Sequence, residues 1–155
     1  MRVKRSGTGK YCGALVLPVD EDDYDELTKE RFFFDWKKEG GHEVYKLCLE
    51  DSGDILGLVS IDRNPAEWRI HIRLLSVSRD NMGVNKRYQG IVGNLFAFTG
   101  KIALQEYGEL ACISLIPKTA LVKHYMREFG MTVTGMTLSM DFLRIMELID
   151  RFDYE

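Results

Sequence analysis

The hydrophobic pattern of this chain changes its period after Ser78, and this change constrains what the chain can fold into. From Glu43 to Ser78, apolar residues lie in strand-like runs that are interrupted by the turn sequence Asp51–Asp54. From Ile91 to Tyr107, they follow a helical stripe, which predicts a helix about 25 Å long. A strand meander followed by a long helix is typical of an α/β or α+β domain.

The segments on either side of this region complete the predicted architecture. Further strands are expected at Tyr11–Val19, Leu110–Ile116 and Met131–Met140, and further helices at Asp22–Glu39, Lys118–Phe129 and Phe142–Phe152. This order predicts a mixed central sheet of about six to seven strands flanked by helices. Because no repeat or linker interrupts the chain, we expect residues 1–155 to form a single domain.

Composition restricts the partners of this domain. The formal net charge of −3 gives no electrostatic reason to expect nucleic acid as the main partner. A local basic patch stays open, because Lys118, Lys123 and Arg127 lie close together in the sequence. No apolar run reaches the roughly 20 residues that cross a bilayer, so no membrane partner is expected. The apolar face of the helix Phe142–Phe152 suggests a homodimer.

The cysteines indicate the compartment. Cys12, Cys48 and Cys112 are far apart in the sequence, and each lies in an apolar, strand-like run. An odd number of cysteines without close spacing predicts neither a disulfide framework nor a zinc site. We therefore expect buried, reduced thiols in a cytoplasmic protein without a metal.

The segment from Ile70 to Ala97 carries the strongest chemical signal. A strand ends near Ser78, a polar loop follows, and Gly90 and Gly93 lie where the long helix begins. The unpaired N–H groups at a helix start and the positive end of its dipole bind phosphate. The alternative is that the two glycines only permit a tight turn and close helix packing.

These residues resemble the GNAT superfamily of acyl-CoA-dependent acyltransferases. Leu75-Ser76-Val77 matches the strand end L-x-V, and the stretch from Tyr88 to Leu95 resembles the loop Q/R-x-x-G-x-G/A, although the glycines fall one place early when counted from Gln89. Downstream, Lys118 occupies the Asn position of N-x-x-A-x-x-x-Y, and Tyr125 occupies the Tyr position. The likeness covers about residues 55–140.

The resemblance implies a GNAT fold that binds acetyl-CoA between two splayed parallel strands, here Arg69–Ser78 and Leu110–Ile116. It assigns cofactor binding to Leu75, Ser76, Val77, Arg87, Tyr88, Gln89, Gly90, Ile91, Val92, Gly93, Asn94, Leu95, Lys118 and Tyr125. It implies an N-acetyltransferase in which a primary amine, on a small molecule or a protein, attacks the acetyl thioester directly in a ternary complex.

The resemblance also suggests catalytic roles for two residues. The backbone N–H near Val77 would polarise the thioester carbonyl, and the Tyr125 phenol would protonate the departing thiolate. Tyr125 could instead serve only to pack its ring against the sheet. For the general base the sequence offers His71, Glu67, Asp80, His124 or water, without a choice among them.

A second function stays open beside catalysis. The irregular glycine spacing and the unassigned base also fit a non-catalytic GNAT-like module that binds acyl-CoA or a protein partner. A third interpretation is an unrelated binder of phosphate ligands at the same helix start.

Overall fold

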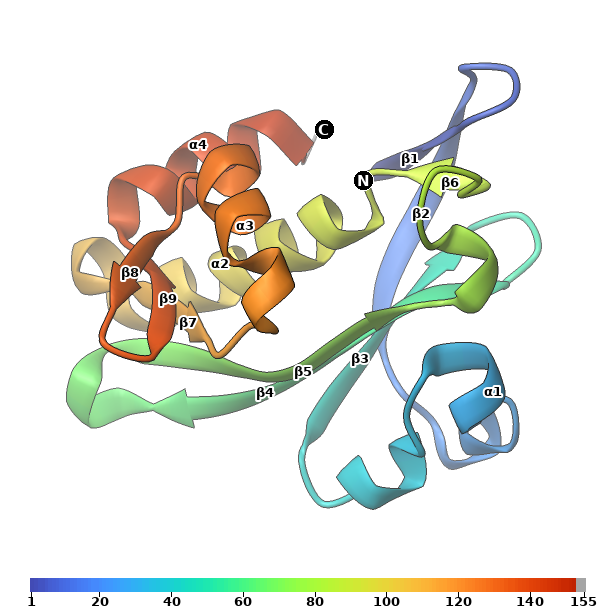
Figure 1. The fold of residues 1–155 in the computed structure, drawn as a ribbon. Coiled ribbons are helices and arrows are strands. Elements are labelled where there is room, and N and C mark those ends of the chain that lie inside the picture. Colours follow the sequence, from blue (N-terminus) through green and yellow to red (C-terminus); the bar gives the residue numbers. More distant parts are fainter. Residues whose placement is uncertain (153–155) are drawn as a thin grey trace.

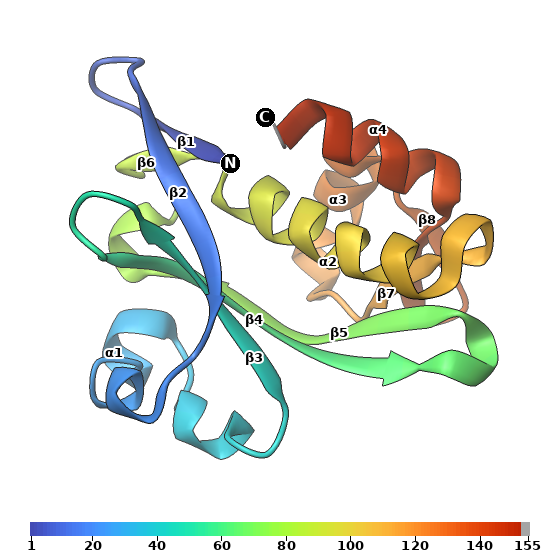
Figure 2. The ribbon, with the colours of Figure 1, turned by 180° about the vertical axis from the view of Figure 1, so that it is seen from behind.

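The computed structural model describes residues 1–152, which form a nine-stranded mixed sheet with helices on both faces (Figure 1, Figure 2). The strands are β1 (Arg2–Arg5), β2 (Tyr11–Pro18), β3 (Glu43–Leu49), β4 (Ile55–Asn64), β5 (Arg69–Val77), β6 (Tyr88–Gln89), β7 (Cys112–Leu115), β8 (Thr132–Thr134) and β9 (Thr137–Met140). The helices are α1 (Lys29–Phe32), α2 (Ile91–Tyr107), α3 (Val122–Phe129) and α4 (Phe142–Phe152). Across the sheet the order is β6-β1-β2-β3-β4-β5-β7-β9-β8.

The predicted mixed sheet flanked by helices is confirmed, but it has more strands than expected. β1 and β6 are short strands that pair with each other. They contain too few residues to show an alternation of apolar and polar side chains. The expected strand Met131–Met140 is instead the β8–β9 hairpin, because the chain reverses at Gly135, whose φ is +64°.

The predicted helix Asp22–Glu39 is wrong. The structure has only α1 and two short 3₁₀ helices in this segment. Side chains cap the N-termini of new short helices within this segment. Thr28 Oγ1 accepts from the Arg31 N–H at 3.3 Å, and Asp35 Oδ1 accepts from the Lys37 N–H at 3.3 Å. Phe33 adopts a left-handed conformation with φ of +67°, which ends α1. Such local bonds compete with a continuous helix.

The main hydrophobic core lies between the sheet and α2. Leu95 and Phe96 of α2 are fully buried there. Gly57 of β4 permits the close approach of the helix, because a Cβ at this position would lie 2.7 Å from Ile91 Cγ2, 3.1 Å from Leu95 Cδ1 and 3.3 Å from the Ser76 carbonyl oxygen. The start of α2 is thereby held against the end of β5.

Helix α4 covers α2 from the other side. Ile145 and Leu148 of α4 are buried in the main core, and Gly100 of α2 lets Ile145 approach closely. The apolar face that suggested a homodimer is therefore used within the chain. No helix within residues 1–152 is long and apolar enough to cross a bilayer.

The opposite face of the sheet carries a second, smaller core. Leu27, Phe32 and Trp36, all from the segment that precedes β3, pack against strand residues such as Leu58. This face holds α1, whereas α2, α3 and α4 group together beside β7, β8 and β9 (Figure 1).

We predict that Gly57→Ala lowers the free energy of unfolding by about 1 to 3 kcal/mol, because the new methyl group would overlap Ile91 in a packed core. Urea unfolding would measure this. Gly41→Ala is the matched control, since no atom lies within 4 Å of the added Cβ, and it should change stability by less than about 0.5 kcal/mol. Equal effects of the two substitutions would contradict the close approach of α2.

Candidate active site

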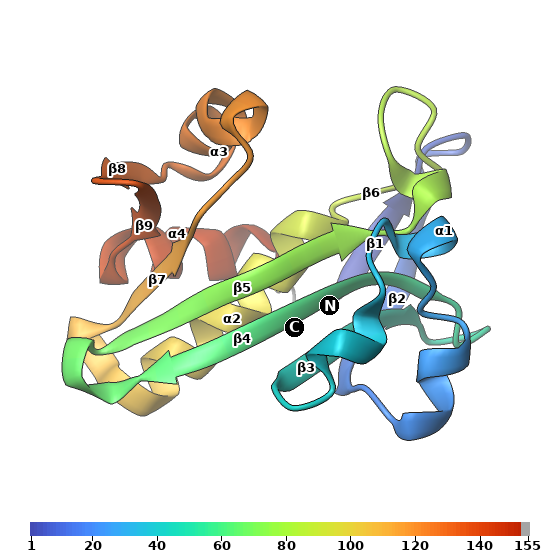
Figure 3. The same cartoon turned by 60° about the horizontal axis from the view of Figure 1, so that its bottom comes forward.

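The candidate site begins where β5 and β7 stop pairing. These are the only parallel neighbours among the described strands, and their last pair is Ile72 with Leu115. β5 continues to Val77 but is then bonded only to β4. Figure 3 shows β7 leading away toward α3 while β5 runs on toward the other end of the sheet. The final part of β5 therefore has a backbone edge without a neighbouring strand.

A bulge lies at the point of divergence. Ser60 of β4 faces Leu74 while Ile61 faces Ile72, so Arg73 is an extra residue in β5. A bulge bends its strand and increases the local twist. This irregularity coincides with the first residue of β5 beyond its pairing with β7.

The direction of the backbone groups beyond the bulge follows from one hydrogen bond. The Ser78 N–H donates to the Leu56 carbonyl of β4 at 2.8 Å. Because successive N–H groups of a strand point to opposite edges, the Val77 N–H points away from β4, to the side where β7 has left. An extended ligand with its own carbonyl groups could be bound along this edge.

The start of α2 lies beside this edge and can bind an anion. Gly90 precedes the helix with φ of +89°, and no side chain caps the first turn. The first helical bond runs from the Asn94 N–H to the Gly90 carbonyl at 3.0 Å. The N–H groups of Ile91, Val92 and Gly93 precede that bond, as the first amides of any helix do. They offer a phosphate donors and the positive end of the dipole.

Asn94 fastens this helix start to the first strand. Its side-chain amide donates to the Arg2 carbonyl at 2.8 Å and to the Gly90 carbonyl at 2.7 Å. The Asn94 side chain is thus structural, and it holds the loop in place from within the protein.

The structure gives Gly93 a packing role. A Cβ on Gly93 would lie 2.2 Å from the Phe152 ring at the end of α4. Gly90 differs, since its nearest neighbours would be Asn94 Nδ2 at 3.6 Å and the Phe152 ring at 3.9 Å. The alternative that these glycines allow a turn at Gly90 and close packing at Gly93 therefore has direct structural support.

The remaining loop residues divide into buried and exposed ones. Tyr88 is buried in β6, where its N–H donates to Asn81 Oδ1 at 2.9 Å and its hydroxyl accepts from Arg5 at 3.1 Å. Gln89 and Arg87 are exposed, and Arg87 pairs with Asp80 at 3.3 Å. Tyr88 is thus structural, whereas Arg87 is open to a ligand.

The side chains at the end of β5 point to opposite faces. Leu75 and Val77 pack into the main core below α2. Ser76 lies between them, and its buried hydroxyl has no hydrogen-bond partner among residues 1–152. On the other side of the divergence, Lys118 is exposed where the chain leaves β7.

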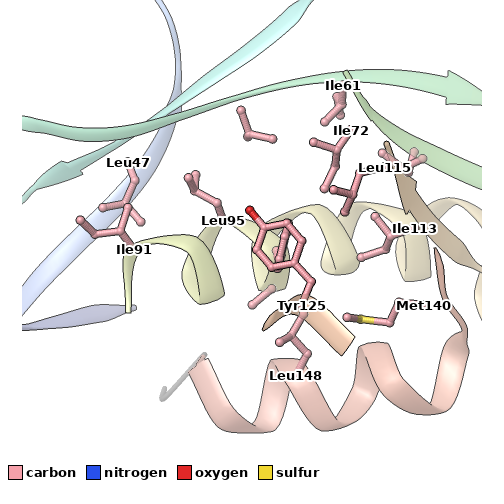
Figure 4. Packing of buried hydrophobic residues seen from close by; sticks show 14 of the residues in the cluster. Leu47, Ile61, Ile72, Ile91, Leu95, Ile113, Leu115, Tyr125, Met140 and Leu148 are labelled. Atoms are coloured by element: carbon pink, nitrogen blue, oxygen red, sulfur yellow. The ribbon is translucent and has the colours of Figure 1, made fainter. Parts of the chain in front are cut away.

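Tyr125 lies in α3 with its ring fixed on α2. The ring packs edge-to-face on Phe96 at a centroid distance of 5.6 Å, and 8% of the residue is exposed. Figure 4 shows the hydroxyl directed away from α4, toward the strands. No protein group within residues 1–152 bonds to this hydroxyl, and burial raises the pKa of the phenol. Tyr125 is therefore a protonated donor at neutral pH.

The structure favours structural roles for two of the four side chains considered as a base. Glu67 pairs with Arg69 at 2.8 Å in the connection from β4 to β5. His71 Nδ1 lies 2.9 Å from Ser114 Oγ of β7 and so joins the two parallel strands where they still pair. Burial lowers the pKa of His71, so its imidazole is neutral at pH 7. His124 is exposed on α3.

A polar cluster that the sequence did not indicate lies at the bulge. Glu39 is buried, and it accepts from Ser60 Oγ at 3.0 Å and from Arg73 Nε at 3.2 Å. Arg73 also contacts Asp62 at 3.1 Å. Glu39 ends a 3₁₀ helix, and nothing in its local sequence marks it as buried. Within residues 1–152, no group of His, Cys, Asp and Glu side chains forms a metal site.

Comparison with solved structures identifies the fold that holds these two diverging strands and this helix start, because acetyltransferases match it over most of the chain. An acetyltransferase of the GNAT family from Listeria monocytogenes matches 92% of this chain and 100% of its own, with a TM-score of 0.59 and 14% identity. A variant of the spermidine N-acetyltransferase SpeG from Vibrio cholerae matches 89% and 97%, with a TM-score of 0.62 and 10% identity.

A third similar structure contains bound coenzyme A. N-acetylglutamate synthase from Neisseria gonorrhoeae, complexed with coenzyme A and N-acetyl-glutamate, matches 86% of this chain and 36% of its own, with a TM-score of 0.62 and 12% identity. The sequence matches no protein-family model and no curated protein. This chain has the GNAT fold, which confirms the resemblance at the level of the fold.

We predict that Gly93→Ala lowers the free energy of unfolding by about 1 to 2 kcal/mol, because the new methyl group would overlap the Phe152 ring. In a Phe152→Ala background the same substitution should cost much less. A double-mutant cycle in urea measures this coupling. A coupling energy near zero would contradict the packing role of Gly93.

Proposed function

We propose that this protein is an N-acetyltransferase that transfers the acetyl group of acetyl-CoA to a primary amine. The observation that carries the proposal is the free edge of β5 beyond Ile72, which ends beside the uncapped start of α2. One surface thus offers backbone hydrogen bonds along β5 for the amide groups of the pantetheine arm. Beside them it offers an anion site for the pyrophosphate. The GNAT fold of the chain supports the same assignment.

The cofactor would lie along this surface. The backbone of Leu75–Val77 would bind the pantetheine arm, and the segment from Arg87 to Leu95 would bind the pyrophosphate, with amides from the first turn of α2. Within that segment, Tyr88 and Asn94 would support the loop rather than contact the ligand. Lys118 would add positive charge from the opposite side of the divergence.

The reaction needs no covalent enzyme intermediate. The amine nitrogen attacks the thioester carbon, the new C–N bond forms, and the C–S bond breaks. The Val77 N–H would stabilise the charge that develops on the carbonyl oxygen. Tyr125 would give its proton to the departing CoA thiolate, and the proton lost by the amine would leave to water or to a nearby carboxylate. Positioning of the two substrates supplies much of the rate enhancement.

The acceptor side of the site would be the face that carries Glu39. The Glu39 carboxylate lies at the bulge where the strands diverge, and it is held there by Ser60 and Arg73. A buried carboxylate at this position would favour a cationic amine over a neutral or anionic acceptor.

A second candidate function is a non-catalytic module that binds acyl-CoA or a protein partner. The packing of Phe152 on Gly93 favours it, because this contact accounts for the glycine without a phosphate. Binding of acetyl-CoA without transfer to any amine would support this second function.

We expect calorimetry to show micromolar binding of acetyl-CoA, and Gly90→Asp to abolish it, because a carboxylate would occupy the anion site. Gly135→Asp is the matched control, since Gly135 also has a positive φ but lies in the β8–β9 turn. It should bind acetyl-CoA like the unmodified protein. Absence of binding to both acetyl-CoA and CoA would contradict the proposed function.

We expect Tyr125→Phe to lower kcat by about 10²-fold or more, because the proton donor is lost, while acetyl-CoA affinity stays within about twofold of the unmodified value. Since burial raises the pKa of Tyr125, its acid role should persist up to at least pH 10 and decline only above it. Steady-state kinetics across this pH range measures both effects. Unchanged kcat in the variant would remove Tyr125 from the reaction.

A further inference from the structure

Positive charge is distributed unevenly along this chain. Residues 1–19, 81–105 and 110–127 contain 10 of the 21 Lys and Arg residues and none of the 24 Asp and Glu residues. The rest of the chain is therefore strongly acidic. The net charge of −3 is therefore the sum of a basic part and an acidic part of the chain.

The sheet brings the first two of these ranges together. β1 pairs with β6, with Lys4 opposite Gln89 and Arg5 opposite Tyr88. The Ser6 N–H donates to the Arg87 carbonyl at 2.9 Å, which extends the contact beyond the strands. The β1–β2 hairpin and the loop before β6 thus form one structure.

The third range leads from β7 into α3, which projects on the same side of the sheet as the loop before β6 (Figure 3). The loop before β6 follows the carboxyl end of β5, and α3 follows the carboxyl end of β7. Because β5 and β7 are parallel, their carboxyl ends face the same way, although β7 ends opposite Ile72 while β5 continues to Val77. Figure 3 shows α3 and the loop before β6 projecting on the same side of the sheet. We call the exposed cations of the β1–β2 hairpin, the loop before β6 and the segment from Lys118 through α3 the basic rim: Lys4, Arg5, Lys10, Lys86, Arg87, Lys118, Lys123 and Arg127.

Most of the basic rim forms no ion pair with another residue in the described part of the chain. Among residues 1–152, only Arg87 of these eight forms an ion pair, with Asp80. Arg5 instead donates to the Tyr88 hydroxyl. The Glu50 side chain lies close to Gly13 on β2. The cations elsewhere in the fold are mostly paired, as Lys46 is with Asp23 and Arg63 with Glu43.

An exposed aromatic ring accompanies these charges. Tyr11 lies opposite Lys4 in the hairpin, and half of its surface is exposed. The Arg2 guanidinium lies 3.9 Å from its ring centroid. Aromatic rings among basic side chains provide stacking surfaces for unpaired bases.

We propose that the basic rim is a binding surface for single-stranded nucleic acid. A strand of phosphates matches cations that are spread over a hairpin, a loop and a helix, whereas one CoA molecule carries too few charges to neutralise them all. The rim is also divided by the divergence of β5 and β7, which suits a flexible strand better than a flat bilayer. The rim shares Arg87 and Lys118 with the proposed cofactor site, whereas Lys4, Lys10 and Lys123 lie outside that site.

The test is fluorescence anisotropy with a labelled 20-nucleotide RNA and the matching DNA, from about 50 to 200 mM salt. The rim variant is Lys4→Glu/Lys10→Glu/Lys123→Glu. The matched control is Lys29→Glu/Lys37→Glu/Lys38→Glu, which reverses the same number of exposed charges on the segment before β3. Acetyl-CoA binding is measured in parallel for all three proteins.

We expect the rim variant to raise Kd at least about 10-fold. The slope of log K against the logarithm of the salt concentration should become shallower by about 2, since each lost phosphate contact removes about 0.7 from it. The control should bind the strand nearly as the unmodified protein does, and acetyl-CoA affinity should be equal in all three. Equal losses in rim and control variants, or no binding of RNA or DNA at 50 mM salt, would overturn the proposal. Rim-dependent binding of anionic vesicles without binding of either strand would overturn it in favour of a membrane.

Discussion

The close packing of α2 on the sheet is the contact on which the rest of the structure depends. Gly57 lets Ile91 and Leu95 approach β4 to a distance that any side chain would prevent. This fixes the first turn of the helix beside the end of β5, where the strand has lost its parallel neighbour. The candidate anion site and the free strand edge therefore lie side by side. Backbone groups, rather than a set of charged side chains, form most of this candidate site.

The two faces of the sheet supply different parts of the proposed chemistry. On the α2 face, Tyr125 is buried in the apolar core, and its phenol stays protonated at neutral pH because burial raises its pKa. On the other face, Glu39, Ser60 and Arg73 form a polar cluster at the bulge. A thioester held in the divergence would lie between a proton donor and a carboxylate.

Several parts of this arrangement were predictable from the sequence. The long helix from Ile91 to Tyr107 and the terminal helix from Phe142 to Phe152 were predicted with the bounds that the structure shows, because their apolar periodicity is strong. The segment before β3 was predicted wrongly as one helix, since capping by Thr28 and Asp35 overrides a loose helical pattern. Glu39 could not be found, because its burial depends on a partner in β5 that lies far away in the sequence.

By itself, the sequence determined the order of the main elements, the phosphate-loop resemblance and the apolar faces of the helices, all of which follow from local spacing. The tertiary structure decided which of two roles each glycine serves: Gly90 turns the chain, while Gly93 makes room for Phe152. It also decided where the charge lies. Three acid-free ranges became one basic rim only because β1 pairs with β6 and because β5 runs parallel to β7. Composition cannot show this, because a net charge contains no information about which residues become neighbours.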